Sequence, residues 1–148
     1  SYHIIHNGTL RDRVCAVSNK THYNEMNVLS MHALIGAYQP QGYEWVDELN
    51  QVLADNIEYF CTYAEKHWKG VAFSRPQGTY MVFLDCTEWC REHGRDIQWL
   101  LDEGARVGVG YQDGRPFHGP CHVRVNLALP LSRVKEACDR LDRYVFNA

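Results

Sequence analysis

Arg124 is the residue of this chain whose type and position most directly suggest chemistry. It lies in the middle of His122–Leu127, where polar and apolar residues alternate and predict a β-strand. The alternation places Val123 and Val125 on one face and Arg124 on the other. A guanidinium offers a planar fork that pairs with a carboxylate through two parallel hydrogen bonds. Arg124 is therefore a candidate carboxylate-binding residue, and the alternation alone equally accommodates a solvent-facing or edge-strand arginine.

Cysteine and histidine residues give a weaker candidate for a metal site. Cys86 and Cys90 are separated by three residues and His93 follows, which lies within the loose range of zinc spacings. No second closely spaced pair completes a ligand set, so we expect no metal site. A chain of 148 residues can bury a core without cross-links, which favours reduced thiols and a cytoplasmic location. The six cysteines concerned are Cys15, Cys61, Cys86, Cys90, Cys121 and Cys138.

Motifs for phosphate binding and nucleophilic catalysis are not matched. Gly104, Gly108, Gly110 and Gly114 do not form a G-x-G-x-x-G run between a strand and a helix, and turns or strand ends explain them better. The G-x-S-x-G elbow of serine hydrolases does not occur in the sequence. These patterns therefore assign no catalytic residue and no cofactor-binding residue to this chain.

Composition excludes several classes of partner. The net charge is −3 and the charged fraction 22%, so there is no basic field to attract nucleic acid or acidic lipid. No apolar run of membrane-spanning length and no secretion leader occurs in the sequence. We therefore expect a globular α/β protein that binds neither nucleic acid nor membrane.

The elements that must position Arg124 follow from changes in hydrophobic period. Pro40–Gly42 should separate two helices, and Ser132 should cap the last helix. The order of elements predicts helices packed on a small mixed sheet, with the first strand lacking a neighbour. Helices are predicted at Thr9–Val17, Glu25–Tyr38, Tyr43–Trp68, Asp96–Glu103 and after Ser132, and strands at Tyr2–His6, Val71–Phe73, Tyr80–Asp85, Arg106–Val109 and His122–Leu127.

Four segments resemble one known family. Gly119–Pro130, GPCHVRVNLALP, resembles the G-x-x-x-x-R-x-N-x-A-x-P run near the end of class I and II aminotransferases, closest to the cystathionine β-lyase-like carbon–sulfur lyases. Pro76–Asp85 is similar to that branch's P-x-G-T-Y-x-x-W-L-D strand, and Glu103–Val107 to its segment leading from helix into strand. Ser1–Ile5 resembles the strand that follows the lysine loop. The resemblance covers nearly the whole chain in the family's order.

This resemblance implies an aminotransferase-like small C-terminal α/β domain at residues 25–148, preceded at residues 1–24 by the tail of the large cofactor-binding domain. It implies a homodimeric parent enzyme that uses pyridoxal 5′-phosphate on an amino acid, by transamination or β-elimination. The residue matching the family's carboxylate-binding arginine is Arg124. The fragment alone is expected to be inactive, because the family's cofactor-binding lysine lies upstream.

Two departures from the family pattern matter. Ser18–Asn24 superficially resembles the lysine motif S-x-S-K-T-x-N, but only nineteen residues precede Lys20, whereas the family's lysine follows a whole domain. We interpret Lys20 as a surface lysine at a helix entry. Val109–Tyr111 stands where the family usually has Pro-Gly.

Two other hypotheses stay open. The chain could be a stand-alone carboxylate-binding or regulatory module without catalysis, or a zinc-binding interaction domain. Its start, within a predicted strand and without methionine, favours a fragment over a stand-alone module.

Overall fold

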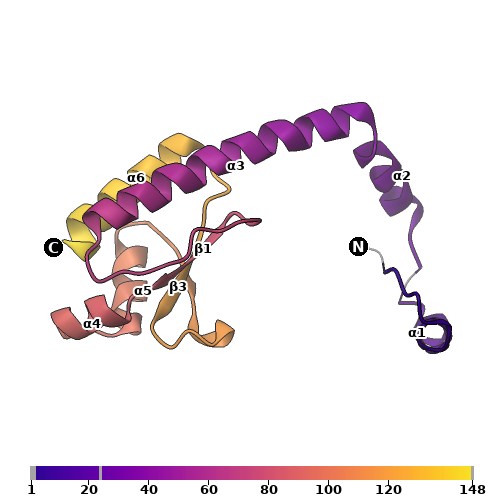
Figure 1. Cartoon of the computed structure of the whole chain (residues 1–148), viewed down its shortest axis with the longest axis horizontal. Coiled ribbons are helices and arrows are strands. Elements are labelled where there is room, and N and C mark those ends of the chain that lie inside the picture. The colour runs from indigo at the N-terminus through magenta and orange to yellow at the C-terminus, as the bar shows by residue number, and fades with distance from the viewer. Residues whose placement is uncertain (1–2, 24, 148) are drawn as a thin grey trace. The chain divides into compact units, whose positions relative to one another are not determined.

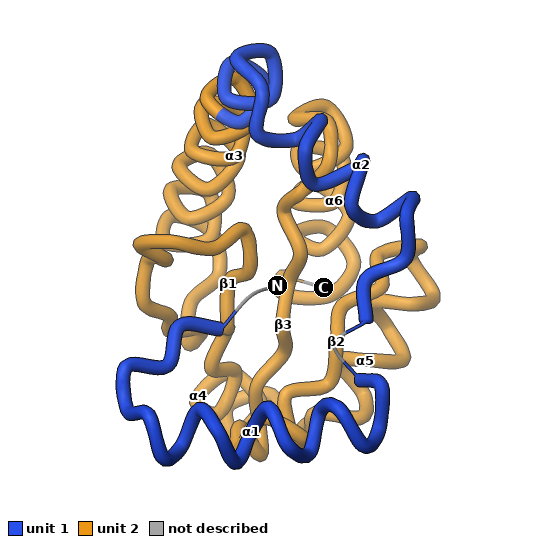
Figure 2. The backbone as a smooth tube through the Cα atoms, turned by 90° about the vertical axis from the view of Figure 1, so that its right-hand side faces the viewer, with its two compact units in different colours: residues 1–46 blue, residues 47–148 orange. Residues whose placement is uncertain are grey.

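The chain forms two units, Ser1–Val46 and Asp47–Ala148, which Figure 2 draws in different colours. This computed structural model describes residues 3–23 and 25–147. The division between the units falls within one long helix. The domain boundary that the sequence predicts after residue 24 stays a prediction.

The N-terminal unit consists of helices with little burial. Helix α1 spans Gly8–Thr21 and α2 spans Val28–Ala37, and α3 begins in this unit and spans Pro40–His67. Asn7 and Asn27 cap α1 and α2, since each side chain accepts the backbone N–H three residues later, at 2.9 and 2.8 Å. No residue of α1 or α2 is buried.

Four predictions for this unit differ from the structure, one of them the break at Pro40–Gly42, which forms the first turn of α3. His3–His6 forms no strand, and Tyr2 lies outside the described residues. A strand is held by ladder partners, and none was expected for this segment. The helix predicted at Thr9–Val17 runs on to the end of α1, so Lys20 is exposed in its last turn and does not stand at a helix entry.

A three-stranded sheet forms the centre of the second unit. Its strands are β1, Met81–Asp85, β2, Gln112–Asp113, and β3, His122–Asn126, in the order β1-β3-β2. Both ladders are antiparallel, and Phe83 lies opposite Arg124. The α/β class is confirmed, while the sheet that was predicted as mixed is antiparallel over the described strands.

Helices α4, α5 and α6 span Thr87–His93, Ile97–Arg106 and Leu131–Leu141. A 3₁₀ turn lies at Arg115–Phe117, and a π-helical turn at Asp142–Phe146 extends α6. In Figure 1, α6 and the C-terminal half of α3 lie side by side along the sheet, and α4 follows the end of β1. Within the described ranges, no helix combines the length and the apolarity needed to cross a membrane.

The core lies between the sheet and these helices. Val82, Leu84, Val123 and Val125 point from the strands into it, as the period-two pattern predicts. Full burial of such a side chain stabilises the fold by roughly 1.5–3 kcal/mol. The helical residues that complete the core include Phe60, Cys61, Ala64, Trp89, Ile97, Leu100, Val134, Cys138 and Leu141.

Four local predictions for this unit were wrong or incomplete. The strand predicted at Val71–Phe73 is reduced to one bridge between Ala72 and Asp85. The strand predicted at Arg106–Val109 is the end of α5 followed by a turn, because Gly108 has a positive φ of 77°. Helix α4 was not predicted. Ser132 lies inside α6, which begins at Leu131 without a side-chain cap.

Removing residues 1–20 should leave the melting temperature of the second unit within a few degrees, because α1 contributes no buried side chain. Circular dichroism melts of the two proteins test this. Removing residues 142–148 is the matched control and should lower the melting temperature strongly, since Val145 and Phe146 are buried. Loss of folding in the N-terminal truncation would contradict the prediction.

Gly104→Ala should destabilise the second unit by about 1–3 kcal/mol, the usual cost of overpacking. A Cβ at Gly104 would come within 2.6 Å of the Tyr111 ring, whose hydroxyl is held by the Leu100 carbonyl. Gly110→Ala is the control, since nothing lies within 4 Å of its Cβ position. Urea unfolding of both variants measures the difference, and equal stabilities would refute the steric argument.

Candidate functional site

Arg124 lies on the central strand of the sheet. Phe83 of β1 pairs with it on one side and Gln112 of β2 on the other. The edge-strand interpretation of Arg124 is therefore wrong. Because its neighbours Val123 and Val125 are buried, the Arg124 side chain points to the opposite, open face of the sheet.

The guanidinium of Arg124 stacks on an aromatic ring and has no acidic partner. Its Cζ atom lies 4.1 Å from the ring centroid of Phe117, a cation–π contact. Over the described residues, no hydrogen bond or ion pair to the guanidinium is present. Arg75, by contrast, binds two glutamates, with its Nη1 2.6 Å from Glu58 and its Nη2 2.8 Å from Glu65. The donors of Arg124 remain available for a ligand.

Phe117 is held in place by the loop between β2 and β3. The Nε of Arg115 donates to both carboxylate oxygens of Asp113, at 3.0 and 2.7 Å. Its Nη2 donates to Oε1 of Gln98 in α5 at 2.9 Å. The hydrogen bonds from Arg115 lower the pKa of the Asp113 carboxyl below its usual range. Gly114 N–H donates to the carbonyl of His122 at 2.9 Å, which fastens this loop to β3.

A second group of polar side chains lies on the same face of the sheet, at the Asp85–His122 pair, two positions from the Phe83–Arg124 pair. His122 Nε2 is 3.8 Å from Asp85 Oδ2. The His122 ring packs on the Phe83 ring, with 4.6 Å between the two ring centroids. Burial opposes ionisation of Asp85, but hydrogen bonds from Thr87 outweigh it and lower the pKa of this carboxyl. A hollow of about 410 Å³ opens here. It is lined by Ala72, Phe73, Ser74, Phe83, Asp85 and His122.

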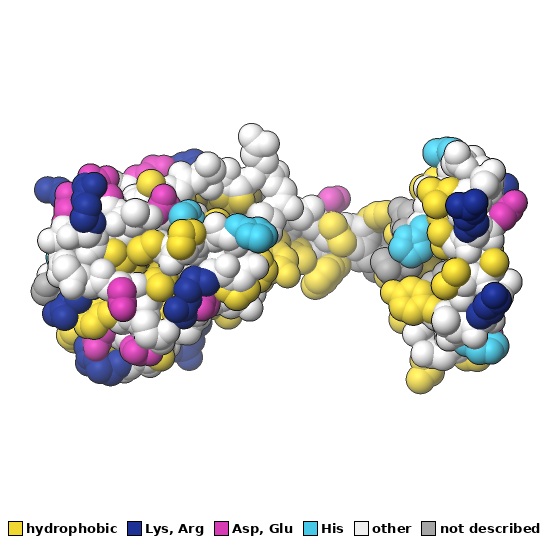
Figure 3. All heavy atoms as spheres, turned by 90° about the horizontal axis from the view of Figure 1, so that it is seen from below, with side chains coloured by type: hydrophobic (Ala, Val, Ile, Leu, Met, Phe, Trp, Pro, Cys, Tyr) yellow, Lys and Arg dark blue, Asp and Glu magenta, His cyan; other side chains and the backbone are white. Residues whose placement is uncertain are grey.

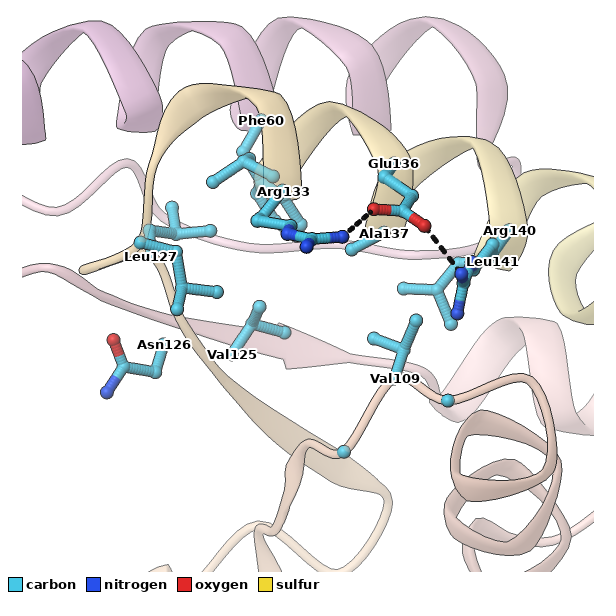
Figure 4. Close-up of a pocket in the computed structure, with 14 residues that line it drawn as sticks. Phe60, Val109, Val125, Asn126, Leu127, Arg133, Glu136, Ala137, Arg140 and Leu141 are labelled. Atoms are coloured by element: carbon cyan, nitrogen blue, oxygen red, sulfur yellow. Dashed lines mark hydrogen bonds and ion pairs between the residues drawn. The ribbon is translucent and has the colours of Figure 1, made fainter.

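A pocket of about 390 Å³ lies between α6, the end of β3 and the turn after α5 (Figure 4). Its floor is apolar and includes Val125, which belongs to the core face of β3. Both of its arginines already bind the same carboxylate, which occupies their N–H donors: Arg133 is 2.7 Å and Arg140 2.5 Å from Glu136. This pocket is therefore a poorer anion site than the open face that carries Arg124.

The cysteines proposed as zinc ligands lie near one another, but their histidine does not join them. Burial and the hydrogen bond with Cys121 raise the pKa of Cys90 to about 12. Cys86 is fully buried, and its pKa is raised mainly by burial. His93 Nδ1 instead lies 2.8 Å from the carbonyl of Trp89. No group of three metal-ligating side chains occurs among the residues that the structure describes.

The aromatic contact to Arg124 is not predicted by the sequence pattern. Phe117 precedes Arg124 by seven residues in a loop, and neither helical nor strand periodicity connects the two. Only the folding back of the β2–β3 loop brings the ring under the guanidinium.

Comparisons with known proteins agree with this architecture. No protein-family model matches the chain. It is 34% identical over 122 residues to a protein of Mycobacterium leprae (strain TN) described as a candidate cystathionine beta-lyase, covering 72% of this chain and 29% of that protein. It is 30% identical over 139 residues to protein MalY of Escherichia coli (strain K12), covering 92% of this chain and 35% of MalY.

The fold matches solved enzymes as well. The pyridoxal-phosphate-bound C-S lyase of Staphylococcus hominis superposes with a TM-score of 0.80 and 25% identity, covering 97% of this chain and 37% of that one. The chain thus spans about a third of the length of its relatives. In sequence and in fold, this chain is a relative of the cystathionine β-lyase-like proteins of the aminotransferase superfamily.

Proposed function

We propose that this chain is the C-terminal part of a pyridoxal-phosphate-dependent enzyme acting on an amino acid, and that Arg124 binds the α-carboxylate of the substrate. The observation that carries this proposal is the guanidinium on the open face of the central strand, which stacks on Phe117 and has no counter-ion in the described chain. The relatives, which are named as lyases or bind the cofactor, support the same assignment.

The geometry suits a carboxylate. Stacking on Phe117 covers one face of the guanidinium and leaves its edge, which carries the N–H donors. An edge-on carboxylate accepts two parallel hydrogen bonds, which fix its direction as well as its position. In the proposed role Arg124 orients the substrate and takes no part in bond breaking, which belongs to the cofactor.

We propose that the cofactor phosphate is held by residues outside this chain. At three glycines before Arg124, protein atoms already fill the space in which a side chain would stand, whereas Gly110 faces open space. A Cβ at Gly108 would meet Arg140 at 2.8 Å, one at Gly114 the His122 carbonyl at 2.4 Å, and one at Gly119 the Phe83 ring at 2.5 Å. We therefore place cofactor binding in a part of the enzyme outside this chain, together with its Schiff-base lysine. Arg124 would serve both transamination and the elimination of a sulfur leaving group, because both reactions require an oriented α-carboxylate.

Arg124→Ala in the holoenzyme should lower kcat/KM at least about a hundredfold, because hydrogen bonds to charged groups contribute about 1.5–3 kcal/mol each and two act together. Arg124→Lys should recover part of the loss, since an ammonium cannot form the fork. Steady-state kinetics measure both, with Arg133→Ala as a control that removes a surface arginine paired to Glu136. An unchanged kcat/KM for Arg124→Ala would return this residue to a solvent-facing role.

The isolated chain should neither retain pyridoxal phosphate nor turn over amino acids. Absorbance spectra after incubation with the cofactor and dialysis test this. A band near the visible edge that survives dialysis and disappears with borohydride would contradict it and make Lys20 a candidate cofactor lysine. Specific amino-acid binding without any cofactor would favour a stand-alone carboxylate-binding module.

A further inference from the structure

Asn56 is a buried polar residue in the middle of α3. Its side chain is 0% exposed, and the next buried positions on the same helix, Phe60, Cys61 and Ala64, are apolar. A buried amide costs free energy unless its donors and acceptors find partners. The reason for an asparagine at this position must therefore lie in what its amide binds.

The amide nitrogen of Asn56 bridges two backbone carbonyls. Its Nδ2 donates to the carbonyl of Leu127 at 2.8 Å and to that of Leu129 at 2.7 Å. The opposite orientation of the amide would set its oxygen against both carbonyls, so the network fixes which atom is the donor. The Oδ1 atom is buried and has no partner in the described protein. One half of this amide is thus left unsatisfied while the other half holds two carbonyls.

These carbonyls belong to the segment that leaves β3. The ladder with β1 ends where Asn126 pairs with Met81, and Leu127 N–H then donates to the carbonyl of Tyr80 at 2.9 Å. Asn126 itself accepts the N–H of Ala128 at 2.8 Å. Asn56 therefore connects α3 by hydrogen bonds to the segment that follows β3, where the β1–β3 ladder has already ended.

We propose that Asn56 is a positioning residue for Arg124, which it influences by fastening the end of β3 to α3. This inference rests on the proposed role of Arg124. Arg124 precedes Leu127 by three residues on a strand that rises about 3.3 Å per residue, so a shift of the exit is transmitted along the strand to the guanidinium. A misplacement of about 1 Å in a substrate-orienting group can cost a hundredfold in rate.

The test is Asn56→Leu in the holoenzyme, with Asn50→Leu as the matched control at an exposed position of the same helix. We expect KM for the amino acid to rise at least about tenfold, within the range for misplaced orienting groups. We expect kcat and the cofactor absorbance to change little. Asn50→Leu should leave all three unchanged. Amide hydrogen exchange at Leu127 and Leu129 should become faster in Asn56→Leu, a readout that does not depend on activity.

The outcomes separate this inference from the proposed function. If Arg124→Ala raises KM while Asn56→Leu does not, the positioning role is wrong and the role of Arg124 stands. If Arg124→Ala has no effect, the proposed function fails first. If Asn56→Leu lowers the stability, the cofactor absorbance and kcat together, without a selective rise in KM, then Asn56 stabilises the fold and does not position Arg124. Asn56→Ala, which removes the amide and adds neither bulk nor charge, gives the same test if the leucine variant does not fold.

Discussion

Burial of alternate residues along β3 is the constraint on which the rest of the second unit depends. Val123 and Val125 enter the core between the sheet and its helices, and this fixes the register of the strand, since a slip of one residue would exchange its two faces. Arg124 is then forced onto the open face without any contact that selects it directly. The apolar neighbours of the arginine, more than the arginine itself, decide where its charge lies.

The two faces of the sheet hold their charges differently. On the core side, two arginines of α6 share Glu136 as their ion-pair partner at the rim of an apolar pocket. On the open side, Arg124 rests on an aromatic ring, which attracts a cation without competing for its N–H donors. A cation held by an aromatic ring keeps its hydrogen-bonding capacity for a ligand, whereas a cation held by a carboxylate does not.

Periodicity predicted the elements that bury a continuous stripe of side chains, and it failed at turns and loops, whose residues follow no period. The stripe of α6 and the alternation of β3 are seen in the structure. The alternation of Val107 and Val109 predicts a strand at the end of α5, but backbone hydrogen bonds form a left-handed turn at Gly108. Phe117 beneath Arg124 could not be predicted, since a loop without period brings it there. The N-terminal unit exposes hydrophobic side chains such as Leu29 and Trp45. Hydrophobic side chains are visible at the surface in Figure 3.

The burial of the thiols has a consequence for the redox chemistry of the protein. Burial raises the pKa of Cys61 to about 11 and that of Cys138 to about 12, so both remain protonated at neutral pH. Only the thiolate is an effective nucleophile, and its population falls tenfold for each unit by which the pKa exceeds the pH. Cys15, in contrast, is exposed on α1. Among the thiols, alkylating agents and peroxides should therefore react first at Cys15, on a helix that contributes nothing to the core.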